Sequence, residues 1–164
     1  MAQARELDEG VTLEHPNREK PESKATRVVV TLLLVASAVL MAIVLFGGWR
    51  VVQPMAIVAF AYIILYLLFA YYVARWRQGT LPIAAGLATI VLMTMFVAAP
   101  RWFDRHAVGY TIPTLPPATL GLIVSLLVPL QLLLIFFALR GFRQNWHVEV
   151  ERLPDGSTRK VPAF

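Results

Sequence analysis

Few side chains in this sequence are of the types that carry out chemistry, and they are scattered. Asp104 and His106 lie two residues apart in a segment with two arginines, and they come closest to a catalytic or metal-binding pair. Zinc needs three or four ligands and a catalytic dyad needs a nucleophile, so two residues are too few for either site. We therefore predict no catalytic residue and no metal site.

The lack of cysteine and the positions of the histidines exclude further classes of chemistry. The chain has no cysteine, which rules out disulfides and thiol redox chemistry. His15, His106 and His147 all lie outside the long apolar stretches, so one copy cannot hold a haem between helices through two histidines. We predict no cofactor. A quinone or pigment beside the aromatic residues of the second stretch is the alternative.

These residues belong to a chain that is far more apolar than a soluble protein. Of its 164 residues, 58% are hydrophobic, and its mean hydropathy is +0.65. Four stretches without Asp, Glu, Lys or Arg are each long enough for a helix to cross the roughly 30 Å hydrocarbon core of a bilayer. They cover residues 28–48, 51–74, 81–100 and 116–139. The sequence predicts an all-α integral membrane protein with four transmembrane helices in two antiparallel hairpins.

The chain divides into three parts around these helices. Residues 1–26 mix charges with prolines and lack an apolar period, which predicts a flexible cytoplasmic tail. Residues 27–144 form the predicted four-helix transmembrane domain. In residues 145–164, alternating apolar positions flank a Pro-Asp-Gly turn at 154–156, and this pattern predicts a small C-terminal β-hairpin. A lone hairpin is marginally stable, so we expect it to pack on the bilayer surface or on another subunit, or to stay partly open.

Basic residues are distributed unequally between the two sides of this predicted domain. With four crossings, both tails and the central loop share one side, which carries twelve Lys and Arg against three on the other. Short loops rich in Lys and Arg stay in the cytoplasm, so both termini are predicted to be cytoplasmic. The preference for Arg over Lys favours the plasma membrane of a bacterium. The net charge of +5 does not by itself indicate nucleic acid.

Tryptophans mark the ends of the predicted spans. Trp49 and Trp102 lie near span ends on one side, and Trp76 and Trp146 lie near span ends on the other. Tryptophan is enriched at both membrane–water interfaces, because its ring is apolar and its N–H can reach water. We predict that these four residues are membrane-interface anchors.

Polar side chains within the predicted helices are few and unreactive. Gln131 is the most polar, and Pro129 beside it predicts a kink, because its ring removes the hydrogen bond to the carbonyl of Ser125. Tyr62 and Tyr66 lie in the second helix. A polar group that bonds a neighbouring membrane helix contributes roughly 0.5 to 2 kcal/mol. These five residues are interpreted as contacts, either with a partner protein or within the chain.

Three functional hypotheses remain. A non-catalytic accessory or assembly subunit of a larger membrane protein complex accounts for the missing chemistry and the short loops. A small oligomeric transporter or channel, with Gln131 in its pathway, is the alternative. A lipid-modifying membrane enzyme centred on Asp104 and His106 is the third. The expected partners are the lipid bilayer and other integral membrane subunits, with self-association as a further option and no nucleic acid.

Overall fold

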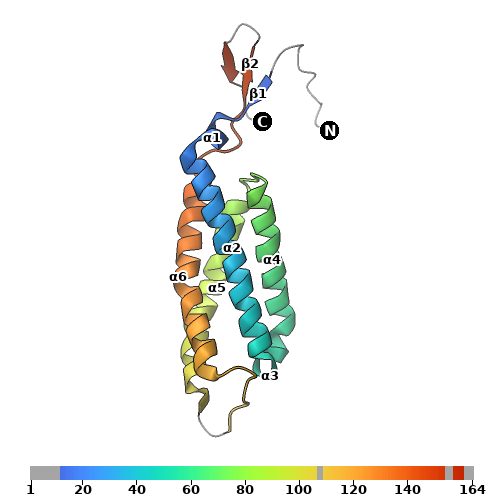
Figure 1. The fold of residues 1–164 in the computed structure, drawn as a ribbon, viewed down its shortest axis with the longest axis vertical. Helices are drawn as coiled ribbons and strands as arrows, with labels where there is room; N and C mark the ends of the chain where they lie inside the picture. Colours follow the sequence, from blue (N-terminus) through green and yellow to red (C-terminus); the bar gives the residue numbers. More distant parts are fainter. Residues whose placement is uncertain (1–11, 107–108, 154–156, 161–164) are drawn as a thin grey trace.

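A computed structural model shows a bundle of four long helical segments with a small sheet at one end (Figure 1). The structure describes residues 12–106, 109–153 and 157–160. The bundle consists of α2 (Pro21–Gly47), α3 (Trp49–Val52), η1 (Gln53–Met55), α4 (Ala56–Ala74), α5 (Thr80–Phe103) and α6 (Pro117–Phe142). With α3 to α4 taken as one segment, the described residues contain four helices that are long and apolar enough to span a membrane, as predicted.

Local sequence explains where these helices begin and end. Pro21 and Pro117 occupy the first turns of α2 and α6, where a missing N–H leaves no helix hydrogen bond unmade. After α2, the backbone N–H of Gly48 donates to the carbonyl of Val44 at 2.8 Å. A Cβ atom at Gly48 would lie only 2.7 Å from the ring of Trp102, so a larger residue would not fit this turn. The next helix, α3, starts directly after this turn, at Trp49.

The four segments do not contact one another equally. α2 packs against α4 and α6, and α5 packs mainly against α6. α4 and α5 have much less contact with each other, although only residues 75–79 connect them. α4 is thus held in the bundle mainly through α2, and the space between α4 and α5 is the least tightly closed.

A three-stranded antiparallel sheet brings the two ends of the chain together. β1 (Thr12–Glu14) and β3 (Thr158–Lys160) each pair with the central β2 (Val150–Arg152). The pairing of β2 with β3 matches the strands expected in the C-terminal segment, whereas the turn at 154–156 lies outside the described residues. We call the end of the bundle that carries this sheet the sheet end, and the opposite end the loop end.

The N-terminal segment differs from its sequence expectation. Residues 12–26, expected to belong to a tail without regular structure, contain β1, the short helix α1 (Pro16–Glu19) and the start of α2. β1 forms because the C-terminal segment supplies its partner strand from more than a hundred residues away. The sequence near residue 12 contains no signal for that partner.

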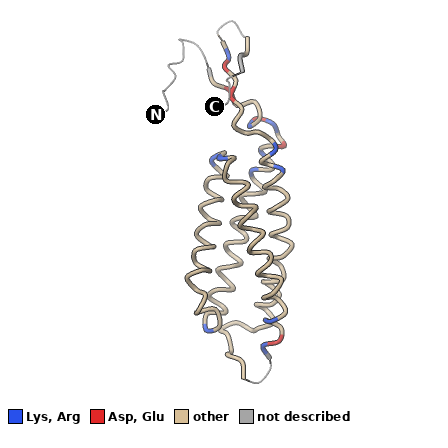
Figure 2. Tube along the Cα trace, turned by 180° about the vertical axis from the view of Figure 1, so that it is seen from behind, with Lys and Arg blue, Asp and Glu red and all other residues tan. Residues whose placement is uncertain are grey.

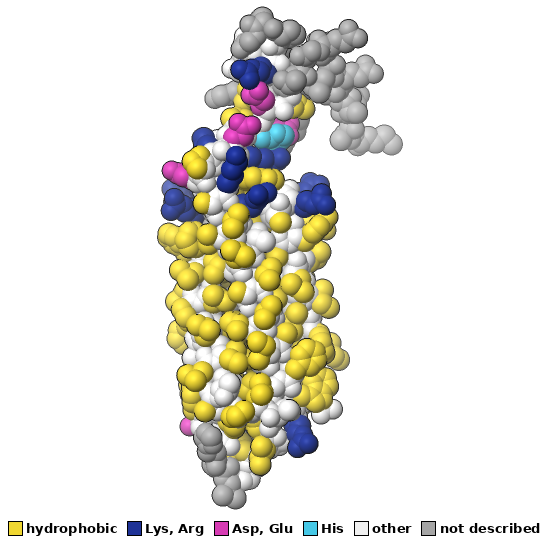
Figure 3. Space-filling model, in the orientation of Figure 1, with side chains coloured by type: hydrophobic (Ala, Val, Ile, Leu, Met, Phe, Trp, Pro, Cys, Tyr) yellow, Lys and Arg dark blue, Asp and Glu magenta, His cyan; other side chains and the backbone are white. Residues whose placement is uncertain are grey.

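The face of the bundle seen in Figure 3 is apolar between two charged ends, and Figure 2 shows that Lys and Arg gather along the chain near these ends. Among the most exposed large side chains are Ile57 at 87%, Met93 at 68% and Leu122 at 65%, one from each of three segments. A soluble four-helix bundle would place polar residues at such positions. The exposed surface and the four apolar helices of the described chain are compatible with a multi-pass membrane protein.

Candidate functional site

The most polar side chains within the helices form a buried junction. The hydroxyl of Tyr66 on α4 donates to Oε1 of Gln131 on α6 at 2.7 Å. Nε2 of Gln131 in turn donates to Oγ of Ser37 on α2 at 3.0 Å. All three side chains are fully buried. We call these three residues the polar junction, and it joins three helices through groups that would be costly to bury unpaired.

The other polar residues predicted from the sequence are placed elsewhere. Pro129 is exposed and Ser125 is half-buried, and α6 continues as a helix through both positions. Tyr62 is half-buried one turn from Tyr66 and lines a separate cavity. The structure therefore joins Gln131 to Tyr66 and leaves the other three residues out of the polar junction. Sequence analysis did not single out its third member, because a serine in an apolar helix carries no signal until the facing helix is known.

Polar groups left over in the described helices are satisfied locally. The hydroxyl groups of Thr31, Thr89 and Thr94 each donate to the backbone carbonyl four residues earlier, at 2.8 to 2.9 Å. Within the described residues, no buried side-chain nitrogen or oxygen lacks a hydrogen-bond partner. The buried polar groups of the described helices thus form hydrogen bonds between or within helices, and none of them is left unpaired to bind a substrate.

At the sheet end, Trp146 is the largest fully buried side chain. Its indole N–H donates to Oε1 of Gln144 at 2.9 Å, and its ring meets the ring of Trp76 edge to face, with centroids 5.2 Å apart. The guanidinium of Arg27 lies 4.4 Å from the Trp76 ring centroid, a cation–π contact. Trp146 therefore packs inside the protein.

Burial separates the four predicted anchors into two pairs. Trp102 at the loop end is 6% exposed and Trp146 is fully buried, so their rings contact protein. Trp49 is 38% exposed and Trp76 is half-buried, which leaves part of each ring at the surface. Anchoring in the membrane interface stays a prediction for Trp49 and Trp76, and a packing role accounts for the other two.

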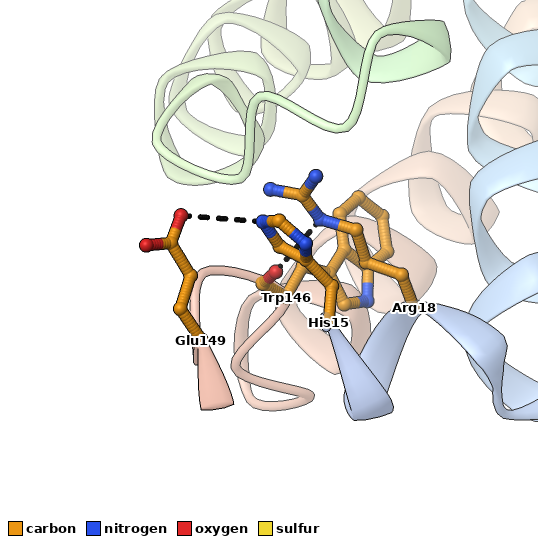
Figure 4. A network of polar contacts seen from close by, with 4 residues as sticks. All are labelled: His15, Arg18, Trp146 and Glu149. Carbon is orange, nitrogen blue, oxygen red and sulfur yellow. Dashed lines mark hydrogen bonds and ion pairs between the residues drawn. The ribbon is translucent and has the colours of Figure 1, made fainter. Parts of the chain in front are cut away.

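The N-terminal and C-terminal segments are fastened together at this end (Figure 4). Nε of Arg18 donates to the backbone carbonyl of Trp146 at 2.9 Å, and Nε2 of His15 lies 3.2 Å from Oε1 of Glu149. Burial lowers the pKa of Arg18, and the Glu149 carboxylate partly offsets this effect. We call β1, α1, β2, β3 and residues 143–149 the terminal cap.

Glutamines connect the terminal cap to the bundle. Gln78, in the connection between α4 and α5, donates through Nε2 to the carbonyl of Phe142. Its Oε1 lies 2.7 Å from Nδ1 of His147; because an amide oxygen only accepts, this contact needs the proton on Nδ1. Nε2 of Gln144 donates to Oγ1 of Thr26 at 3.0 Å. The connection at 75–79 and the start of α2 are thus both tied to the terminal cap.

A cavity of about 400 Å³ lies at the loop end, between α2, the α3–α4 segment and α5. Its lining is mainly apolar, and it includes Tyr62 and Trp102. Two charged residues, Arg101 and Arg105, complete it. This cavity could not be predicted from the sequence, because it lies where α4 and α5 contact each other little, and no residue pattern specifies that contact.

Of the pair considered first for chemistry, Asp104 and His106, the structure describes only the side chain of Asp104. Asp104 belongs to the short helix η2 (Asp104–His106), and its side chain is exposed. The side chain of His106 lies outside the described residues. No group of three or more His, Cys, Asp or Glu residues that could hold a metal ion occurs among the residues described. An enzyme centred on this pair remains an untested hypothesis.

The described residues thus form a helical bundle that is compatible with a small multi-pass membrane protein and that carries a buried polar junction and a structured terminal cap. No family model, no curated protein and no solved structure matches the chain. Its function is therefore argued from its own residues.

Proposed function

We propose that this chain is a non-catalytic accessory or assembly subunit of a larger membrane protein complex. It crosses the plasma membrane of a bacterium four times, in two antiparallel helix hairpins, with both termini in the cytoplasm. The main support is a contrast within the described residues. The polar side chains of the helix interiors bond within the chain, whereas the terminal cap extends beyond the bundle (Figure 1).

The distribution of charge supports this orientation. In Figure 2 the Lys and Arg residues gather at the two ends of the helices, with more of them at the sheet end. The described basic residues of the sheet end are Arg18, Lys20, Lys24, Arg27, Arg75, Arg77, Arg140, Arg143 and Arg152. The loop end carries Arg50, Arg101 and Arg105. Under the positive-inside rule, the sheet end faces the cytoplasm.

The terminal cap offers a means of contacting a partner. Within the described residues, β1 and β3 each pair only with β2, so the outer edge of each has no neighbouring strand there. Exposed strand edges present backbone N–H and C=O groups, and another protein can add a strand to them. Each strand is three residues long, which favours a short, specific contact over open-ended aggregation.

The alternative of an oligomeric transporter or channel receives less support from the interior. A pathway needs polar groups that face water or substrate, and the side chains of Gln131 and Tyr66 are instead fully buried and bonded to each other. The apolar stretches 28–48, 51–74, 81–100 and 116–139 contain no charged side chain that could couple transport to an ion gradient. A pathway would therefore have to form between copies of the chain.

The test is a pull-down of the tagged, full-length protein from its native membrane in mild detergent, followed by native-gel sizing and mass spectrometry. A stoichiometric complex with other integral membrane proteins is expected. Val150→Pro, which removes a backbone N–H from the central strand, should release a partner held through the sheet. The control is Ile57→Val on the exposed flank. A wild-type protein that purifies only as a monomer or homo-oligomer would contradict the proposal.

A further inference from the structure

The cavity at the loop end has the depth of one bilayer leaflet. On α5 and η2 its lining begins at Val91 and reaches Arg101 and Arg105. Arg101 follows Val91 by ten positions, which corresponds to a rise of about 15 Å along a helix at about 1.5 Å per residue. The hydrocarbon core of a bilayer is about 30 Å thick, so this distance is about half of it. The cavity therefore extends from the loop end to about the middle of the membrane.

Its interior suits a flexible hydrocarbon chain. Met41, Met55 and Met95 line it together with several valines, and methionine side chains adapt to chains of variable shape. Thr94, one of its few polar residues, already donates to the carbonyl of Ile90 at 2.9 Å. The volume of about 400 Å³ lies within the range of roughly 300 to 1,000 Å³ that is typical of small-molecule sites.

Its outer end suits a negative charge. Arg101 and Arg105 both line the cavity, and neither forms an ion pair with a carboxylate in the described part of the chain. The Arg105 guanidinium lies 5.1 Å from the ring centroid of Trp102 and 5.7 Å from that of Tyr110, which restricts its position. Guanidinium groups bind phosphate oxygens through paired hydrogen bonds. Two guanidinium groups thus lie at the outer end of an apolar cavity, where the phosphate of a lipid headgroup would be.

We propose that this cavity binds an anionic phospholipid of the leaflet at the loop end. One acyl chain lies between α4 and α5, and the phosphate contacts Arg101 and Arg105. The limited contact between α4 and α5 provides a lateral entrance from the membrane. A quinone or another neutral amphiphile would fill the apolar space but would leave both guanidinium groups without a counter-charge. This binding site is independent of the accessory-subunit proposal.

The first experiment measures lipid retention by native mass spectrometry of the full-length protein, purified in detergent and incubated with phosphatidylglycerol or phosphatidylcholine. The wild type is expected to retain phosphatidylglycerol preferentially. Arg101→Gln with Arg105→Gln should weaken that binding about tenfold or more, because two charge-assisted contacts are lost. Arg50→Gln is the control, since Arg50 lies at the same end but does not line the cavity. Equal retention of both lipids, or no effect of the double change, would overturn the proposal.

A second pair of variants tests the acyl-chain position. Ala98→Phe places a large ring in the cavity lining, whereas Val97→Phe places the same ring at a position that is 61% exposed and does not line the cavity. Only Ala98→Phe should reduce retention of phosphatidylglycerol. If both variants retain the lipid as the wild type does, the chain does not enter the cavity and the proposal is wrong.

A measurement on the wild-type protein covers the case in which Ala98→Phe fails to fold. Phosphatidylglycerol with a photoreactive diazirine on one acyl chain is reconstituted with the protein and irradiated, and the labelled peptides are mapped. We expect labels within 41–45 and 91–98, the parts of α2 and α5 that line the cavity, above the level on exposed flanks such as 132–133. Uniform labelling of the lipid-facing surface would show ordinary annular lipid and would overturn the proposal.

Discussion

The two ends of the bundle are built on different principles. At the sheet end, directional hydrogen bonds between side chains and backbone join segments that are far apart in sequence, as from Gln78 to Phe142 and from Arg18 to Trp146. At the loop end, apolar packing around Trp102 and Leu120 joins the helices and leaves a cavity beside it. Hydrogen bonds specify one arrangement, whereas apolar contact tolerates several. The sheet end is therefore suited to a defined protein contact, and the loop end to an adaptable ligand.

Glycine also distinguishes regions of the bundle. A Cβ atom at Gly141, near the sheet end, would lie 3.1 to 3.3 Å from side-chain atoms of Leu81, Thr26 and Trp146. A Cβ atom at Gly86, farther along α5, would meet nothing within 4 Å. Side-chain atoms thus pack closely around Gly141 and Trp146, whereas Gly86 is exposed on the outer face of α5.

The largest expected effect comes from removing the ring at the centre of the sheet end. Trp146→Ala deletes a fully buried indole and should destabilise the protein by about 3 to 5 kcal/mol. Trp49→Ala, which deletes an indole that is 38% exposed, should cost much less. Thermal unfolding in detergent measures both. Equal losses would mean that the sheet end is no better packed than the surface.

The next effect concerns the polar junction. Gln131→Leu leaves the hydroxyl groups of Tyr66 and Ser37 without their shared partner and should destabilise the protein by about 1 to 3 kcal/mol. Tyr66→Phe in the Gln131→Leu background should add little, because the bond is already lost. Ser125→Ala, half-buried on the same helix, is the control. Additive losses in the double variant would show that the two residues act independently.

A smaller change in stability, of opposite sign, is expected when two helical glycines are replaced by alanine. Gly86→Ala should stabilise the protein by about 0.4 to 1 kcal/mol, because the new methyl group meets open space and the unfolded chain loses freedom. Gly141→Ala should instead be destabilising by about 1 kcal/mol, since its neighbours must move. The two melting temperatures should shift in opposite directions. A stabilised Gly141→Ala variant would show that the packing around Trp146 yields readily.

The smallest effect is expected at the outer edge of the terminal cap. Glu14 accepts a hydrogen bond from Arg152 at 2.8 Å, but the two side chains are 42% and 56% exposed. Glu14→Gln should therefore change stability by less than about 0.5 kcal/mol, since water and salt screen such pairs. Stability should also respond little to salt between low and physiological concentrations. A loss above 1 kcal/mol would mean that the terminal cap depends on this ion pair.

The helix ends show what could be predicted and why. The second stretch was expected at 51–74 and the structure has Trp49–Ala74, since the arginines and tryptophans near its ends mark where the chain leaves an apolar environment. The first stretch was expected to start at 28, yet α2 begins at Pro21. Hydropathy reports the apolar length only, and a helix continues beyond it wherever backbone bonds and tertiary contacts allow.

The sites were predictable only in part. Gln131 stood out because an amide is unusual in an apolar helix, and Tyr66 was one of two tyrosine candidates on the second stretch. Their union with Ser37 depends on how three helices face one another. β1 is a similar case, because a three-residue strand is stable only with a partner, and that partner lies near the other end of the chain.

The sequence alone therefore determined the apolar composition of this protein, the positions of its long apolar stretches and the absence of cysteine chemistry, because each depends on composition or on patterns within one segment. Only the tertiary structure decided that Trp146 is buried, that segments near both ends of the chain share a sheet, and that a cavity lies between α4 and α5. These features arise between residues far apart along the chain, where burial and hydrogen bonding depend on which surfaces meet.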